Sequence, residues 1–176
     1  YHHLIPHLLK TDRDLYVILI IRNPLSVLAS WVKAPKEFDP MTMKLETEWR
    51  KAGLKNGVRE EEFYGFDKWK EFALIALEMK RIYPDRCMII DYRELLNNTK
   101  REITECFDFC GIPIEQQTLD FIAISKGNDL SADAYSVYRV NQDDEKWRGA
   151  LPKSISQEII QELKGTVLEK YLHEGH

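Results

Sequence analysis

The chain has 176 residues, of which 44% are hydrophobic and 31% are charged, and its formal net charge at pH 7 is -4. This length predicts one domain with a single hydrophobic core over 1–176. The acidic balance argues against a nucleic-acid-binding protein, because such proteins carry a basic surplus on one face. No stretch has the roughly 20 consecutive apolar residues that a membrane span requires.

The first residues and the cysteines indicate whether the chain is part of a longer protein and in which compartment it works. The chain begins at Tyr1 with neither an initiator Met nor a signal-peptide pattern, so we expect it to be cut from a longer protein. There are three cysteines, an odd number, and Cys106 and Cys110 are four residues apart in a predicted helix, which argues against a disulfide framework. A reducing, cytoplasmic compartment is therefore the expectation, with the lumen of a secretory compartment as the alternative.

The first predicted elements are a strand and a helix joined by a tight turn. Residues 15–21 are all apolar and rich in β-branched side chains, which is typical of a strand buried on both faces of a parallel sheet. After the turn at Arg22 and Asn23, Pro24 suits the first turn of a helix. Apolar residues then follow at helical spacing, namely Leu25, Val27, Leu28, Trp31 and Val32.

A second helix and a second strand complete a repeating unit. Residues 33–65 are mixed and polar, which predicts a variable insertion or lid with a short helix at 41–51. A helix is predicted over 64–83, before Pro84, because apolar residues recur every three or four positions. These are Trp69, Phe72, Ile75, Met79 and Ile82. Residues 87–90 read as a second buried strand, so the pattern predicts a βαβ unit with a parallel sheet.

The last third of the chain is predicted to be mostly helical. Thr99 and Glu102 form the capping-box pattern of a helix that ends near Gly111. Another helix is expected over 115–124, followed by a long loop over 125–153. Ser154 and Gln157 begin a final helix. Its expected buried positions are Ile155, Ile159, Leu163 and Val167.

Arg22 and Ser30 are the first candidates for ligand binding. An Arg at the carboxyl end of a parallel strand points into the crevice where open α/β sheets bind ligands, and the following helix offers amide donors to an anion. Ser30, eight residues later, is placed to face the same crevice. The pair predicts a phosphate site. The alternative is that Arg22 caps a neighbouring helix and Ser30 is an ordinary surface serine.

The segment from Arg22 to Trp31 resembles the 3′-phosphate-binding segment of sulfotransferases, in which a strand-ending Arg is followed by a Ser eight residues later. The resemblance implies that Arg22 and Ser30 bind the 3′-phosphate of the donor, 3′-phosphoadenosine-5′-phosphosulfate (PAPS). Residues 88–95 are similar to the aromatic-acidic turn of the family, which implies that Tyr92 lies against the adenine. Here Arg93 departs from the usual acidic pair, and a plain turn aromatic is the alternative.

Two further stretches resemble the family. Arg139 and the segment 146–149 match a basic loop that folds over the 3′-phosphate, which implies a phosphate contact for Arg139 and a packing role for Trp147; a solvated loop is the alternative. Residues 3–9 resemble the segment that carries the catalytic base, which implies that His3 takes the proton of the acceptor. His2 and His7 lie on the same stretch.

The resemblance implies an α/β fold with three layers and a mostly parallel sheet, of the P-loop-NTPase-like sulfotransferase type. The chain corresponds to the last two-thirds of such a domain, because the family's Lys-Ser-Gly-type loop for the 5′-phosphosulfate has no match in it. Without that part we expect impaired donor binding and a sheet that lacks its central strand. Trp31, Phe63 and Tyr64 are candidates for the acceptor pocket, with ordinary packing as the alternative.

The implied reaction moves a sulfuryl group from PAPS to a hydroxyl or amine of a small-molecule, lipid or carbohydrate acceptor, and leaves 3′,5′-adenosine diphosphate. No metal is expected, because the His and Cys residues lack the paired spacing of zinc ligands. Two alternatives stay open: a nucleotide-dependent phosphotransferase of related fold, and a noncatalytic scaffold domain. The acceptor and the oligomeric state cannot be read from this sequence.

Overall fold

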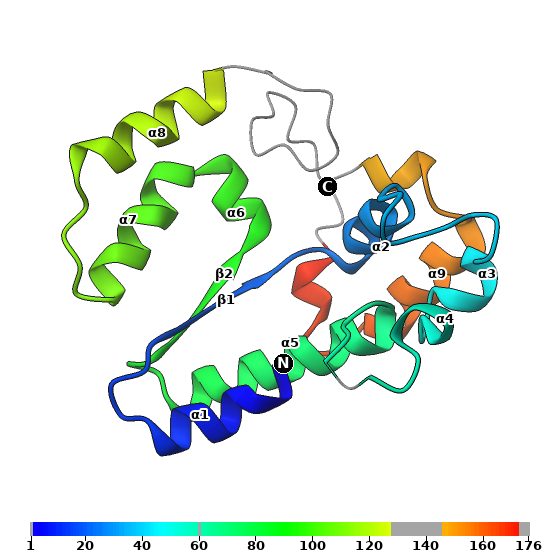
Figure 1. Cartoon of the computed structure of the whole chain (residues 1–176), viewed down its shortest axis with the longest axis horizontal. Helices are drawn as coiled ribbons and strands as arrows, with labels where there is room; N and C mark the ends of the chain where they lie inside the picture. Colours follow the sequence, from blue (N-terminus) through cyan, green and yellow to red (C-terminus); the bar gives the residue numbers. More distant parts are fainter. Residues whose placement is uncertain (1, 60, 128–145, 173–176) are drawn as a thin grey trace.

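The computed structural model describes residues 2–59, 61–127 and 146–172, and within them two parallel strands lie between two layers of helices (Figure 1). The strands are β1 (Val17–Ile21) and β2 (Cys87–Asp91), paired in register from Val17 beside Cys87 to Ile21 beside Asp91. One layer holds α1 (Ile5–Thr11) and α5 (Phe66–Ile82). The other holds α6 (Tyr92–Asn97), α7 (Thr99–Phe109) and α8 (Gln116–Gly127). The predicted βαβ unit and parallel sheet are confirmed.

The expectation that β1 is buried on both faces is wrong for the described residues. Leu19 and Ile21, on the face toward α5, are buried, whereas Ile18 and Ile20 on the other face are 37% and 46% exposed. The reason is that α6 and α7, in the helix layer on that side, pack mainly against β2 rather than β1. One face of β1 therefore stays partly open, with Tyr16 in edge contact with Phe109 of α7.

Helix α5 covers the sheet with a different stripe from the one that its largest apolar residues predict. The buried residues are Phe66, Trp69, Ala73, Ala76 and Met79. Ile82 is instead 45% exposed, and Phe72 and Ile75 are half-buried. Two alanines in the buried stripe let α5 lie close to β2, against which it packs.

The insertion after α2 (Pro24–Val32) contains two single-turn helices instead of one helix over 41–51. These are α3 (Leu45–Glu48) and α4 (Gly53–Asn56). Ala52 separates them with a left-handed φ of 49°, which ends one helix before the next begins.

Neither predicted capping box forms. The Thr99 hydroxyl donates to the carbonyl of Leu95, 2.6 Å away, because α6 ends directly before α7 and places that carbonyl within reach. Glu102 pairs instead with Arg101. The final helix, α9 (Lys153–Leu163), has no side-chain cap at its start. The predicted long loop contains the last turn of α8 and the 3-10 helix η2 (Lys146–Gly149).

The chain turns at the end of α9, where the sequence predicts more helix. Gly165 has a φ of 74°, which ends the helix, so Val167 is 66% exposed rather than buried. The 3-10 helix η3 (Glu169–Tyr171) then carries Tyr171 into the core beside Leu168 and Leu172.

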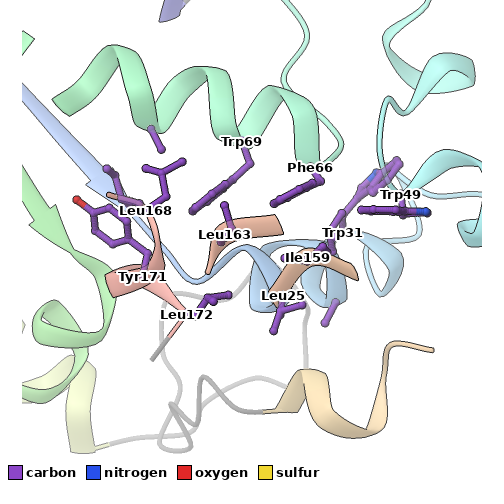
Figure 2. Close-up of a cluster of buried hydrophobic side chains, with 14 of the residues drawn as sticks. Leu25, Trp31, Trp49, Phe66, Trp69, Ile159, Leu163, Leu168, Tyr171 and Leu172 are labelled. Carbon is purple, nitrogen blue, oxygen red and sulfur yellow. The ribbon is translucent and has the colours of Figure 1, made fainter. Parts of the chain in front are cut away.

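The core lies where α2, α5, α9 and η3 meet (Figure 2). Phe66 and Trp69 reach down from α5 toward Ile159 and Leu163 of α9 (Figure 2). Trp147 of η2 is 8% exposed, so its predicted role as a packing anchor is confirmed. No helix in the described part of the chain is long and apolar enough to cross a membrane.

Candidate functional site

The parallel pairing of the strands brings two predicted ligand residues together. Arg22 directly follows β1 and Tyr92 directly follows β2, and the last pair of the register is Ile21 beside Asp91. The guanidinium carbon of Arg22 lies 4.7 Å from the centroid of the Tyr92 ring, a cation–π contact. The guanidinium of Arg22 therefore lies over the Tyr92 ring at the carboxyl ends of the two strands, where α/β sheets bind ligands.

The backbone of the turn after β1 is held from two directions. The indole Nε1 of Trp69 donates to the carbonyl of Arg22 at 2.9 Å. The Oδ1 of Asn23 accepts from the amide of Leu25 at 2.9 Å and caps α2, while its Nδ2 donates to the carbonyl of Leu172. Sequence reasoning missed the cap, although an Asn directly before a helix-starting Pro signals one.

A cavity of about 240 Å³ opens beside Arg22. Its walls are Arg22, one face of α2 that includes Ser30 and Trp31, Glu37, and residues 63–65. Arg22 and Ser30 therefore line the same cavity, although eight residues separate them. Ser30 is exposed at its rim.

The outer wall of this cavity is aromatic and carries one carboxylate. Tyr64 packs against Trp31 with ring centroids 5.5 Å apart, and Phe63 stacks on Tyr64 at 4.9 Å. Glu37 Oε2 lies 2.6 Å from Lys55 Nζ and accepts a hydrogen bond from the Tyr64 hydroxyl at 2.6 Å. These two partners lower the pKa of Glu37. The insertion thus folds back on α2 and is fastened there.

Glu37→Gln is expected to destabilise the protein at neutral pH by about 1 kcal/mol, because Gln keeps the shape but loses the charge-assisted bonds. The folded-state pKa of Glu37 is below the ordinary value of 4.5, so its contribution is complete above 4.5 and is lost as the pH falls through the lowered value. Urea unfolding at several pH values should show the difference from wild type shrinking toward acid. Glu78→Gln, an exposed helix pair, is the control; an equal loss there would contradict the assignment.

The amino-terminal histidines lie in the 3-10 helix η1 (His2–Leu4). His2 is buried, with Nε2 2.8 Å from Glu71 Oε1 and its ring against Phe72. His3 is exposed beside it. His2 thus has a packing role, and His3 stays the predicted base. Arg139 lies outside the described residues. Among the described residues no cluster of three or more His, Cys, Asp or Glu is suited to hold a metal ion.

Comparisons with known proteins identify the family and the fold of the chain. The family model for the sulfotransferase domain matches residues 1–169, so the chain belongs to the sulfotransferase domain family. No curated protein matches the chain.

A crystal structure of the mouse sulfotransferase SULT7A1 complexed with PAP is similar in fold, with a TM-score of 0.61 and 20% sequence identity. The match covers 92% of this chain and 63% of the mouse chain, so this chain spans less than two-thirds of that enzyme. The predicted α/β sulfotransferase fold is confirmed.

Proposed function

We propose that this chain forms the 3′-phosphoadenosine side of a PAPS-dependent sulfotransferase site, which transfers a sulfuryl group to a hydroxyl or amine of a small-molecule acceptor. One observation carries the proposal: Arg22 stacks on Tyr92 at the ends of two parallel strands and shares a cavity with Ser30. A guanidinium, a hydroxyl and an aromatic face are the groups that a ribose phosphate next to a purine requires.

Each residue has a distinct task in this proposal. Arg22 donates charge-assisted hydrogen bonds to the 3′-phosphate, and Ser30 donates its hydroxyl to the same group. Tyr92 offers its ring to the adenine. Arg139, which lies outside the described residues, would add positive charge near the 3′-phosphate.

His3 would act as the general base. It takes the proton of the acceptor hydroxyl while the acceptor oxygen forms its bond to sulfur and the bond from sulfur to the 5′-phosphate oxygen breaks. The products are the sulfated acceptor, 3′,5′-adenosine diphosphate and a proton held on His3. Alignment and charge stabilisation supply most of the rate in such group transfers.

Isothermal titration calorimetry on the protein with its natural flanking sequence tests this proposal. We expect micromolar binding of 3′,5′-adenosine diphosphate and much weaker binding of 5′-adenosine monophosphate, which lacks only the 3′-phosphate. If the protein binds only a nucleoside triphosphate in the presence of Mg²⁺, and not 3′,5′-adenosine diphosphate, it is instead a phosphotransferase. Binding of none of these nucleotides would indicate a scaffold domain, and either result overturns the proposal.

A further inference from the structure

The segment 168–172 lies at the turn that presents Arg22. Its residues Leu168, Tyr171 and Leu172 are each 3% exposed, and Figure 2 shows them grouped beneath α5 at one end of the core. The carbonyl of Leu172 accepts a hydrogen bond from Asn23 Nδ2, and Asn23 is itself 3% exposed. A contact across 149 residues of sequence therefore reaches the residue next to Arg22.

Tyr171 of the same segment is buried, and this burial together with the negative charge of Asp91 raises the pKa of its phenol to about 12. Asp91 Oδ1 accepts from the amide of Arg93 at 2.9 Å and so caps α6, the helix that begins with Tyr92.

Arg22 and Tyr92 are each next in sequence to a residue whose side chain caps a helix. Asn23, after Arg22, caps α2, and Asp91, before Tyr92, caps α6. Segment 168–172 hydrogen-bonds to the first of these caps, Asn23. It therefore holds the turn from which Arg22 projects.

We propose that segment 168–172 acts as a clamp, meaning that it fixes the conformation of the turn after β1 through the hydrogen bond between Leu172 and Asn23. Asn23 is then a positioning residue for Arg22, and recognition of the donor's 3′-phosphate depends on the segment being packed in place. The inference rests on the proposed function. When the Leu172 carbonyl loses its partner, α2 keeps a cap but the turn gains conformations in which Arg22 is misplaced. The apparent affinity for 3′,5′-adenosine diphosphate is then the intrinsic affinity multiplied by the fraction of molecules in which Arg22 is correctly placed.

Two variants weaken the hydrogen bond between Asn23 and Leu172, one by changing each partner. Asn23→Ser keeps a neutral N-cap oxygen but removes the amide that reaches Leu172. Leu172→Ala leaves the carbonyl in place but removes the buried side chain that seats the segment. The readout is the 3′-phosphate preference, defined as the dissociation constant of 5′-adenosine monophosphate divided by that of 3′,5′-adenosine diphosphate.

We expect either variant to lower the 3′-phosphate preference about tenfold, the effect of one hydrogen bond on a positioned charged group. Met79→Ala is the structural control, because it opens a cavity in the last turns of α5 near the start of β2. It should lower the melting temperature and leave the preference unchanged. A merely structural role for Asn23 would give the same result as Met79→Ala.

The outcomes separate this inference from the proposed function. If Asn23→Ser and Leu172→Ala keep the wild-type preference while Arg22→Ala abolishes it, the clamp is refuted and the proposed function stands. If Arg22→Ala also keeps the preference, both are refuted. A loss of preference in both clamp variants, with Met79→Ala unaffected, supports the clamp.

Discussion

Replacing Arg22 by alanine is expected to weaken binding of 3′,5′-adenosine diphosphate about 100-fold, because the substitution removes charge-assisted hydrogen bonds to a phosphate. Binding of 5′-adenosine monophosphate should change far less. Arg22→Lys keeps the charge but loses the planar fork that stacks on Tyr92, so we expect a loss of about tenfold. Calorimetry with the two nucleotides measures both effects.

The control for Arg22 is Arg81→Ala, which makes the same charge change on the exposed side of α5, where Arg81 pairs with Glu78. Its affinity should stay within about twofold of wild type, because screened surface charge contributes little at that distance. Equal losses in the two variants would show that net charge, and not a specific site at the end of β1, governs binding.

Gly65→Ala is expected to destabilise the fold by about 3 kcal/mol or more, measured by urea unfolding. Gly65 has φ 89° and ψ 161°, a backbone region that is essentially restricted to glycine. A Cβ there would also lie 2.7 Å from the carbonyl oxygen of Arg50 and 3.1 Å from the amide nitrogen of Ala52. Both neighbours are backbone atoms, so the clash is not relieved by turning a side chain.

Gly111→Ala is the matched control, because Gly111 also has a positive φ, 65°, but a Cβ there would meet nothing within 4 Å. It should lose about 1 kcal/mol, the strain of a left-handed residue alone. The difference between the two variants isolates the clash at Gly65. Similar losses would mean that the close approach to Arg50 is easily relaxed.

Gly65 also matters for the site. It precedes the first residue of α5 and lines the cavity with Arg22 and Ser30. One turn further on, Trp69 donates to the carbonyl of Arg22. A backbone shift at Gly65 is therefore expected to weaken nucleotide binding in the molecules that still fold.

Much of the fold was predictable because the signals are local. The apolar runs of β1 and β2 and the repeat along α5 each lie within a few residues of sequence. Arg22 and Ser30 could be named as candidates because they follow a strand end at a fixed distance, whereas Tyr92 was named because residues 88–95 resemble the sulfotransferase family. Parallel pairing then places strand ends together whatever the rest of the chain does.

Helix boundaries and caps were predicted less well, because they depend on competing partners. Thr99 bonds back to Leu95, and α9 ends at Leu163, before its predicted last turn, because Gly165 adopts a left-handed φ. In both places the local pattern fits a helix signal, and a neighbouring backbone group or a left-handed glycine overrides it.

The sequence by itself determined the strands, the main helices and the residues that end the strands, because an apolar repeat and an N-cap signal act over one or two turns of chain. Only the tertiary structure decided what holds Arg22 in place. Trp69 is 47 residues from Arg22, and Leu172 is 149 residues from Asn23. No periodicity encodes such contacts, because they arise when separate elements pack around one core.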